Sequence, residues 1–294
     1  MTARLVTQGK STMVRRPNAG AESKMTTDLE LDSYFRRIGY AGARAPSLEA
    51  LRELHLRHPS SIPFENLDVL LKAPIRLDLP SLVDKLITRG RGGYCYEHNT
   101  LLMSALQAMG FRVRSLAGRV QWQAPGKVAA RHHMALLISL PEGEFLADVG
   151  FGGLTLTAPL RFVADIEQET PHGNYRIVAM HEEFQIQAKI DGDWHPLFQL
   201  SLAEQAAADW DSANWFISTS PDSIFTRTLM AALPLADHRY TLRNNRLSLH
   251  RRGGVSEHRI ISSADELIDV LRQTFHLNIP KGADLSAIAS VAGL

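Results

Sequence analysis

The spacing of the apolar residues changes once along this chain, near Gly110. Before that glycine the apolar residues recur three or four positions apart, as they do on one face of a helix. After it they form short runs that are typical of β-strands. This separation of helical and strand patterns favours an α+β fold.

The helical region is expected to cover residues 27–110, and its helices have recognisable start and stop signals. The expected helices run from the N-cap Asp32 to Arg37, from Leu48 to Arg57 between the N-cap Ser47 and Pro59, from 79 to 88, and from Cys95 to Gly110. The helix that begins at Cys95 matters most, because it holds the only cysteine of the chain.

Residues 111–215 are expected to form a β region, and residues 216–294 mix both patterns. The expected strands are 111–121, 133–140, 144–149, 175–180, 184–190, 194–200, 240–242 and 247–250. Hairpin turns are expected at Glu142-Gly143 and Asp191-Gly192. A last helix is expected from about Ala264 to Phe275, opened by a capping box of Ser263 and Glu266.

Residues 1–26 lack the apolar run of a secretory signal, and we interpret them as a disordered extension. The remaining chain is long enough to bury a large core.

Composition excludes several classes of function. The chain has 294 residues, with 32 Lys and Arg against 31 Asp and Glu, so its net charge of +1 would not attract nucleic acid or an anionic membrane. A single cysteine forms no internal disulfide, and no apolar stretch reaches the length of a membrane helix. Neither a zinc motif nor a phosphate-binding glycine loop is present. We therefore expect a soluble cytoplasmic protein that acts on a small molecule without a metal.

The segment from Arg89 to Asn99 carries the strongest chemical signal. Three glycines precede Tyr94 and Cys95, and the cysteine then falls in the first turn of a helix. The dipole and free N–H groups of a helix start favour a thiolate, and Arg89 and Arg91 are expected to act in the same direction. A lone cysteine is usually an inert buried residue. The glycine loop and the helix start favour a nucleophile instead.

A catalytic thiol needs a base and a group that orients the base. Among the histidines, His133 begins an apolar strand, whereas His98 lies on the cysteine's own helix and His132 points to the opposite strand face. A turn at Glu142-Gly143 pairs Leu137 with Asp148, so that His133 and Asp148 share a face but lie four residues apart, about 13 Å. A regular hairpin alone would therefore not join them.

Several segments together resemble the arylamine N-acetyltransferase family. The similar segments are Arg91-Gly92-Gly93-Tyr94-Cys95, Ile62-Pro63-Phe64-Glu65-Asn66-Leu67, His133-Met134, Asp148-Val149-Gly150-Phe151-Gly152, and Ser218-Thr219-Ser220-Pro221 with Ser223 and Phe225. The likeness extends from about Asp28 to Phe225. Where this chain has His98, the family more often has an amide side chain.

The resemblance implies a helical bundle with the cysteine, a central β-barrel with the histidine and aspartate, and a C-terminal α/β lid. It implies that Cys95, His133 and Asp148 meet as a catalytic triad, and that Cys95 carries an acetyl group as a thioester. Acetyl-CoA would be the donor, and arylamines, arylhydrazines or arylhydroxylamines the acceptors, in a ping-pong reaction.

The resemblance also implies the remaining contacts of the site. An apolar slot for the acceptor would be lined by Tyr96, Phe151 and Phe225. The phosphates of CoA would be held by Gly150, Gly152, Gly153, Ser218, Thr219 and Ser223.

Two other interpretations remain open. A Cys-His-Asp hydrolase, such as a cysteine peptidase or a transglutaminase-like enzyme, uses the same residues. A non-catalytic binding or scaffold protein would keep the fold with an unreactive Cys95. The sequence also leaves open the physiological acceptor, the acyl-chain preference and a homodimer.

Overall fold

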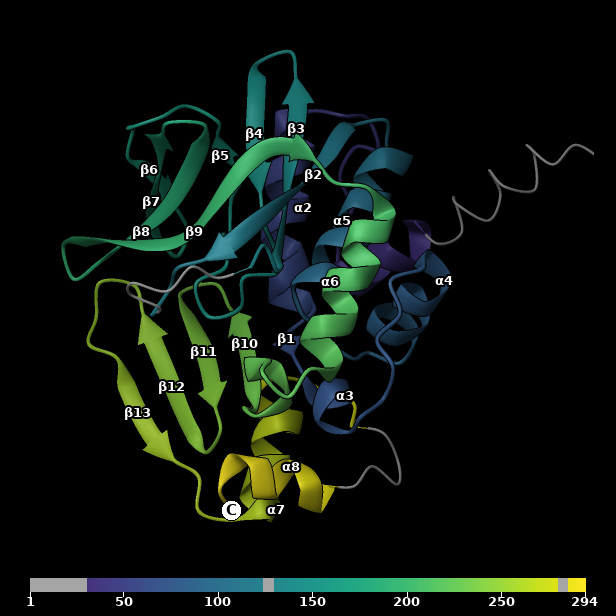
Figure 1. The fold of residues 1–294 in the computed structure, drawn as a ribbon, viewed down its shortest axis with the longest axis vertical. Helices are drawn as coiled ribbons and strands as arrows, with labels where there is room; N and C mark the ends of the chain where they lie inside the picture. Colours follow the sequence, from purple (N-terminus) through teal and green to yellow (C-terminus); the bar gives the residue numbers. More distant parts are fainter. Residues whose placement is uncertain (1–30, 124–129, 280–284) are drawn as a thin grey trace, which may run out of the picture.

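A computed structural model describes residues 31–123, 130–279 and 285–294 of the chain. In Figure 1 helices gather on the right, a strongly curved sheet occupies the upper left, and a second sheet with two C-terminal helices lies below it. This arrangement confirms the α+β fold class. The expected extension over residues 1–26 lies outside the described residues.

The first five helices include the four that were expected, three of them with different ends. They comprise residues 31–38, α2 (Leu48–Ser61), α3 (Leu67–Leu70), α4 (Leu79–Leu82) with the π-helical η1 (Val83–Thr88), and α5 (Cys95–Ala108). The hydroxyl of Ser47 caps α2 by accepting from the main-chain N–H of Ala50 at 3.1 Å. Asp32 lies inside its helix, so its expected role as an N-cap is wrong.

Pro59 does not end α2, contrary to the expectation. The helix continues through Pro59 to Ser61, and the N–H of Ile62 still donates to the carbonyl of His58 at 2.9 Å. A proline inside a helix removes one hydrogen bond, here the one that residue 59 would give to the carbonyl of His55. Because the side chains of His55, His58 and Pro59 are all buried, tertiary packing holds this last turn in place.

The larger sheet has eight strands in the order β5-β4-β3-β2-β9-β8-β7-β6. Its strands are β2 (Arg112–Val120), β3 (His133–Leu140), β4 (Gly143–Ala147), β5 (Leu160–Arg161), β6 (Gln168–Thr170), β7 (Gly173–Met180), β8 (Glu183–Ile190) and β9 (Asp193–Glu204). The sheet curls into a nearly closed, barrel-like shape. The two edge strands are linked where the side-chain amide of Gln168 bonds the main chain of Arg161.

The smaller sheet has the order β1-β10-β11-β12-β13 and draws on both ends of the chain. Its strands are β1 (Phe64–Glu65), β10 (Met230–Pro234), β11 (His238–Arg243), β12 (Arg246–Arg251) and β13 (Glu257–Ile260). The helices α7 (Ala264–Asp269), continued by η3 (Val270–Thr274), and α8 (Leu285–Ala292) lie below it in Figure 1. At α7 the expected capping box is half formed, because Glu266 accepts from the N–H of Ser262 rather than of Ser263.

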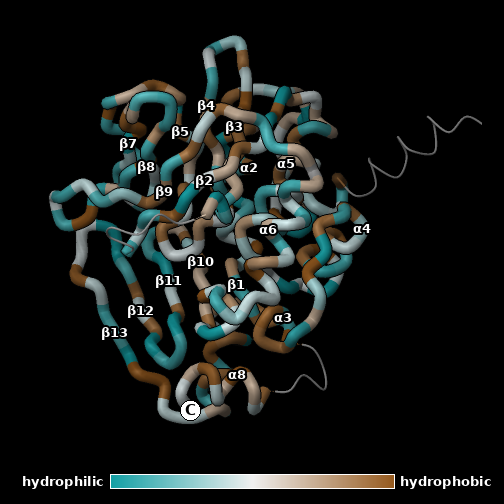
Figure 2. Tube along the Cα trace, in the orientation of Figure 1, coloured by the Kyte–Doolittle hydropathy of each residue, from teal (hydrophilic) through white to brown (hydrophobic). Residues whose placement is uncertain are grey.

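Several elements were absent from the sequence-based expectation. They are α3, α6 (Ala207–Thr219), the 3₁₀ turn η2 (Ile224–Thr226), α8, and strands β1, β5, β6, β10 and β13. Most are short, and α6 crosses the expected boundary between residues 215 and 216. Figure 2 shows α3 as strongly hydrophobic, and its leucines are buried. Such short segments acquire their structure from packing rather than from a periodic pattern.

Candidate active site

Cys95 is the first residue of α5, at the point where the glycine loop meets the helix. The carboxylate of Glu97 accepts a hydrogen bond from the main-chain N–H of Tyr94 at 3.0 Å, which closes the first turn. The cysteine is 4% exposed, and it is a free thiol. The helix start and the burial together place the sulfur in an enclosed site beside unpaired main-chain N–H groups.

His133 and Asp148 meet directly, because the β3–β4 register differs from the expected one. The turn is at Pro141 and Glu142, and Leu137 pairs with Leu146 rather than with Asp148. Since Leu136 pairs with Ala147, Asp148 lies opposite residue 135, two positions from His133, or about 7 Å along the strand. The two side chains bridge this remaining gap, with Nε2 of His133 2.7 Å from Oδ2 of Asp148.

This geometry gives each member of the pair a defined charge. Burial alone would lower the pKa of His133, but the charge and hydrogen bond of Asp148, together with Cys95, raise that pKa to about 10. Burial opposes ionisation of Asp148 as well, yet His133, Asn99 and the N–H of Gly150 keep its pKa below the usual value. Nε2 of His133 faces Asp148, so Nδ1 is the nitrogen that remains for Cys95. Near neutral pH the arrangement therefore holds an imidazolium between a carboxylate and the thiol group.

Three residues hold Asp148 in place, and the sequence reasoning gave none of them this role. The side-chain N–H₂ of Asn99 donates to Oδ1 of Asp148 at 3.0 Å and to the carbonyl of Met134 at 2.8 Å. The N–H of Gly150 donates to the same Oδ1 at 2.9 Å. The N–H of Asp148 itself donates to Nε2 of His55 at 3.0 Å. Asn99 lies one helical turn after Cys95, and that spacing is the signal that could have identified it.

Buried ion pairs anchor the glycine loop before Cys95. Arg91, 1% exposed, bonds Glu65 and Asp68 at 2.7 and 2.9 Å. Lys85 joins the same network, with Asp68 at 2.9 Å and Glu97 at 2.7 Å. On the surface, Arg89 pairs with Asp84. Arg89 and Arg91 therefore have partners other than the thiolate that we expected, and Arg91 fixes the shape of the loop.

Aromatic rings pack on His133 and on Tyr94, the residue before Cys95. Phe151 meets the ring of His133 edge-on at 5.2 Å, and Phe198 lies 4.6 Å from the same ring. Phe225 lies 5.4 Å from Tyr94 and 6.2 Å from Phe64. Of these rings, the sequence reasoning singled out only Phe151 and Phe225.

Tyr96, expected at the same slot, is fully buried between other rings. Its centroid lies 5.5 Å from Trp210 and 5.8 Å from Tyr94. Its hydroxyl has no hydrogen-bond partner among the described residues. Tyr96 therefore packs as a core residue below the nucleophile.

The residues expected to hold the phosphates of CoA differ in what they contact. The hydroxyls of Ser218 and Thr219 donate to carbonyls of α6, and that of Ser223 accepts from the N–H of Phe225. Gly150 packs directly on Cys95, since a Cβ there would lie 2.7 Å from the Cα of the cysteine. The carbonyls of Gly152 and Gly153 accept from Thr155 and Arg239. In the same loop, the N–H of Phe151 donates to the hydroxyl of Thr155 at 3.3 Å.

A buried chain of hydrogen bonds runs beside the triad without joining it. It links Tyr34 to Nδ1 of His58 at 2.9 Å, Nε2 of His58 to Nδ1 of His98 at 2.9 Å, and Nε2 of His98 to the carbonyl of Pro63 at 3.3 Å. Burial lowers the pKa of His98 to about 4 and that of His58 well below its usual value. His98 is therefore neutral and bonded elsewhere, while His132 packs on Phe216 at 4.7 Å.

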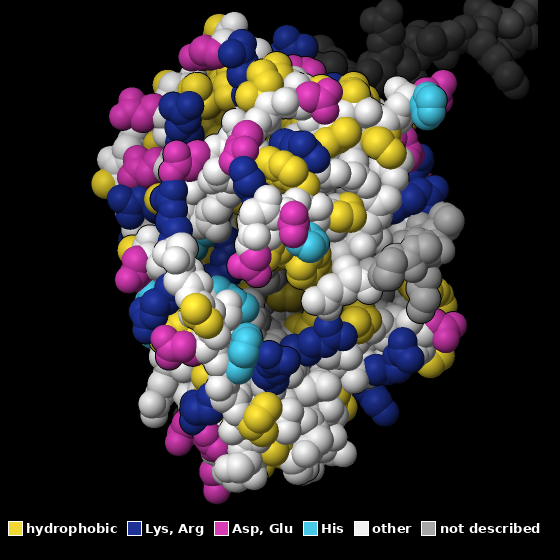
Figure 3. All heavy atoms as spheres, turned by 90° about the vertical axis from the view of Figure 1, so that its left-hand side faces the viewer, with side chains coloured by type: hydrophobic (Ala, Val, Ile, Leu, Met, Phe, Trp, Pro, Cys, Tyr) yellow, Lys and Arg dark blue, Asp and Glu magenta, His cyan; other side chains and the backbone are white. Residues whose placement is uncertain are grey.

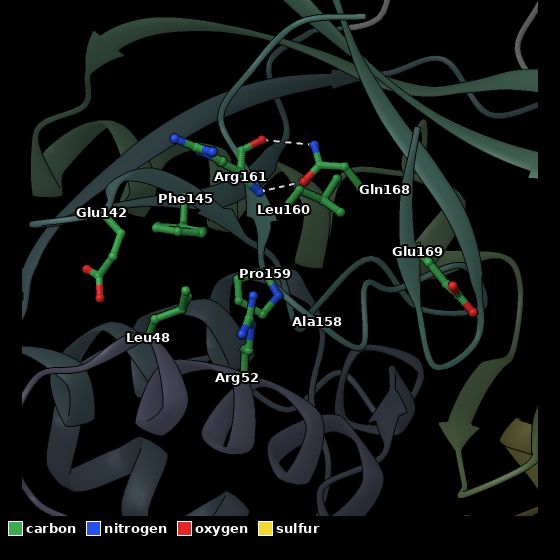
Figure 4. Close-up of a pocket in the computed structure, with 10 residues that line it drawn as sticks. All are labelled: Leu48, Arg52, Glu142, Phe145, Ala158, Pro159, Leu160, Arg161, Gln168 and Glu169. Atoms are coloured by element: carbon green, nitrogen blue, oxygen red, sulfur yellow. Dashed lines mark hydrogen bonds between the residues drawn. The ribbon is translucent and has the colours of Figure 1, made fainter. Parts of the chain in front are cut away.

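The molecular surface has depressions of different kinds. Figure 3 shows a hollow near the middle of one face, with hydrophobic side chains in its floor and histidines and basic residues at its rim. A separate pocket of about 340 Å³ lies between α2 and the edge of the larger sheet, and no member of the triad lines it. Figure 4 shows Arg52 and the bonded pair Arg161 and Gln168 at its wall.

The described residues contain no cluster of His, Cys, Asp and Glu suited to a metal ion. Among the same residues, no helix is both long enough and apolar enough to cross a membrane.

The sequence of this chain matches those of known proteins. A family profile described as N-acetyltransferase matches residues 47–283. The arylamine N-acetyltransferase of Escherichia coli (strain K12) is 40% identical over 250 residues, covering 85% of this chain and 89% of that protein. The arylamine N-acetyltransferase of Mycolicibacterium smegmatis is 38% identical over 269 residues, covering 90% and 98%.

Solved structures agree with this result. The structure of Mycobacterium marinum arylamine N-acetyltransferase superposes with a TM-score of 0.86 at 39% identity, covering 89% of this chain and 99% of that one. A structure of the same protein in complex with CoA superposes with a TM-score of 0.85 at 38% identity, covering 89% and 98%.

Proposed function

This chain belongs to the arylamine N-acetyltransferase family, and on that premise we propose that it transfers acetyl groups by a ping-pong reaction through a thioester on Cys95. It is an acyltransferase that uses acetyl-CoA as its donor. Arylamines, arylhydrazines and arylhydroxylamines are the proposed acceptors. The observation that carries the mechanism is the 2.7 Å contact between His133 and Asp148, made beside a cysteine at a helix start.

In the first half-reaction the thiolate of Cys95 attacks the carbonyl carbon of the acetyl thioester. The bond between that carbon and the sulfur of CoA breaks, and CoA leaves with the proton of the His133 imidazolium. Main-chain N–H groups in the first turn of α5 lack helical partners and would stabilise the oxyanion. Cys95 then carries the acetyl group, and His133 is neutral.

In the second half-reaction the acceptor amine attacks the carbonyl of the acetylated Cys95. His133 takes the proton of the amine, the bond from carbon to Sγ breaks, and the thiolate and imidazolium are restored. Asp148 stays ionised throughout and holds the ring with Nδ1 toward the sulfur. The sum is the conversion of acetyl-CoA and an amine into CoA and an amide.

The aromatic rings near the triad supply the acceptor slot in this proposal. Phe151 and Phe225 would hold an aromatic acceptor, with Phe198 and Phe64 behind them, since such rings attract other aromatic groups beyond their buried area. Tyr96 would support the site by packing against Tyr94 and Trp210. The phosphates of CoA would contact the loop around Gly152 and Gly153 and the segment of Ser218, Thr219 and Ser223.

Burial of the nucleophile favours the transferase over the hydrolase. Cys95 is 4% exposed, and His133 is 2% exposed. A peptidase needs an open groove for an extended chain and free access for water, whereas an acetylated thiol must be shielded from water until the amine arrives.

The first experiment measures the intact mass of the protein after brief exposure to acetyl-CoA, with Cys95→Ser as the control. We expect a gain of one acetyl group that requires Cys95 and disappears when an aromatic amine or hydrazine is added. If an alkylating reagent labels Cys95 but acetyl-CoA leaves no adduct, the thioester mechanism is wrong.

Two further expectations belong to this proposal. A cytoplasmic location is supported by the donor, acetyl-CoA, and by the lone free thiol. A homodimer stays a prediction, and sedimentation velocity would decide it.

A further inference from the structure

Three buried histidines lie between α2 and α5, next to the triad. His55 and His58 lie one turn apart on α2, His98 lies on α5, and each is 0% exposed. His58 and His98 belong to the chain of hydrogen bonds that ends at Pro63. His55 faces a different partner, the main-chain N–H of Asp148, at 3.0 Å.

The hydrogen bond to Asp148 defines the tautomer of His55. A main-chain N–H only donates, so Nε2 of His55 must be the unprotonated, accepting nitrogen. Burial outweighs the nearby charge of Asp148 and lowers the pKa of His55 to about 4, which keeps the ring neutral near pH 7. The single ring proton therefore resides on Nδ1.

Pro59 makes that tautomer favourable. Nδ1 of His55 has no partner with good hydrogen-bond geometry among the described residues, but it lies close to the carbonyl oxygen of its own residue. In a regular helix the N–H of residue 59 would occupy this oxygen, and proline has no N–H. This carbonyl gives the proton on Nδ1 a negative partner in a buried setting.

The main chain of Asp148 depends on side chains for its position. Strand β4 ends at Ala147, so Asp148 follows the last pair of the ladder with β3. Its N–H donates to His55, and its carbonyl accepts from the hydroxyl of Thr155 at 3.1 Å. Without an acceptor at position 55, this buried N–H would be unpaired, and the chain would shift to find another partner.

We propose that His55 is a positioning residue for acetyl transfer: as a neutral acceptor it fixes the main chain of Asp148, and thereby the carboxylate that holds His133. The inference rests on the proposed function of the triad. It assigns His55 no contact with substrate, and it predicts that the acceptor atom, rather than the volume of the ring, is what the reaction requires.

A measurement on the unaltered protein tests the tautomer. Long-range ¹H–¹⁵N spectra of protein labelled at histidine distinguish protonated from unprotonated ring nitrogens. We expect His55 with its proton on Nδ1 and His98 with its proton on Nε2. A coupling across the hydrogen bond from the N–H of Asp148 identifies the His55 signal. A proton on Nε2 of His55 would overturn the proposal.

Three variants test the effect on the triad. His55→Gln keeps an acceptor near the position of Nε2, and His55→Leu removes it. His58→Leu is the matched control, because it removes an equally buried histidine from the same helix without touching Asp148. Each variant is assayed for the rate of Cys95 acetylation, for the pH profile of Cys95 alkylation by iodoacetamide, and for its thermal midpoint.

We expect His55→Leu to slow acetylation at least about 10-fold and to weaken alkylation most at low pH, where the imidazolium sustains the thiolate. His55→Gln should stay within about threefold of the wild type, since it retains an acceptor. His58→Leu should lower the thermal midpoint and leave the alkylation profile unchanged. An unchanged profile in His55→Leu, or an equal change in His58→Leu, would overturn the proposal.

The alkylation profile needs no acetyl-CoA. If the wild type forms no acetyl adduct but His55→Leu still alters alkylation, the proposed function fails and the role of His55 stands. If acetylation proceeds and His55→Leu matches the wild type in both assays, the proposed function stands and the role of His55 fails.

Discussion

Replacement of Gly150 by alanine distinguishes two roles for the loop after Asp148. The sequence resemblance makes this glycine a contact for the phosphates of CoA. In the structure its N–H already donates to Asp148, and its Cα faces α5. A contact for the donor would affect chiefly the KM for acetyl-CoA, whereas a spacer between the loop and α5 would affect the chemical step.

The size of the expected effect follows from the contacts. A Cβ at position 150 would lie 2.7 Å from the Cα of Cys95, 3.1 Å from its carbonyl oxygen, and 3.0 Å from Nδ2 of Asn99. Ordinary contacts begin at 3.4 Å, so the loop and the helix must separate by about 0.7 Å, the difference between 3.4 and 2.7 Å. Two of the three close atoms belong to the main chain and cannot rotate away.

A displacement of this size separates Cys95 from His133 and Asp148. Misplacement by about 1 Å can slow an enzyme by about 100-fold. We therefore expect Gly150→Ala to slow acetylation of Cys95 by about 10- to 100-fold, and to lower the free energy of unfolding by about 1 to 3 kcal/mol through overpacking. The KM for acetyl-CoA should change much less than kcat.

The assay is single-turnover acetylation of Cys95, followed by intact mass in a rapid-quench experiment over a range of acetyl-CoA concentrations. Gly254→Ala is the matched control, because it lies in the turn between β12 and β13, where its Cβ would meet the Cβ of Arg251 at 3.2 Å. We expect that control to stay within about threefold of the wild type. A Gly150→Ala enzyme with a normal maximal rate and a raised KM would refute the packing argument.

Three other predictions concern charge. Asp148→Asn should slow acetylation by about 10³- to 10⁴-fold, as loss of the orienting carboxylate does in other triads, and it should lower the pKa of His133, which a pH titration of Cys95 alkylation would detect. The folded-state pKa of His133 is raised from 6.5 to about 10, so its stabilising contribution is complete below pH 6.5 and disappears as the pH rises toward 10. The thermal midpoint of the wild type should therefore fall between these two pH values. The midpoint of Asp148→Asn should fall less. Glu65→Gln should lower the free energy of unfolding, measured by urea titration, by about 3 to 5 kcal/mol, because buried Arg91 loses a charged partner. The double variant Glu65→Gln with Arg91→Met should recover part of this loss. Equal stability of Glu65→Gln and the wild type would refute this.

Local patterns were sufficient for the long elements. The strand His133–Leu140 has the bounds that its apolar run indicates, and the helix that starts at Cys95 ends at Ala108, two residues before the expected Gly110. The expected strand at 144–149 is β4, shifted by one or two residues at each end. Elements of a few residues, such as β1 and α3, were missed because too few side chains repeat to form a pattern.

The ends of elements depended on tertiary context. Pro59 lies in a buried turn of α2, where packing outweighs the loss of one hydrogen bond. The β3–β4 turn moved by one residue, from Glu142-Gly143 to Pro141-Glu142, and this changed the register by two. Because side chains alternate with a period of two, the shared face of His133 and Asp148 survived the change, while their separation was halved.

The sequence by itself determined the fold class, the helix-start position of Cys95, and the common strand face of His133 and Asp148, because these follow from local spacing. Only the tertiary structure decided which groups hold the triad together. Asn99, His55 and Gly150 meet Asp148 from two helices and a loop, and Arg91 turns toward Glu65 rather than toward the thiol. Apart from the contact of Gly150, which lies two residues after Asp148, these contacts join residues 26 to 93 positions apart. No local pattern encodes them, because they depend on how the whole chain packs.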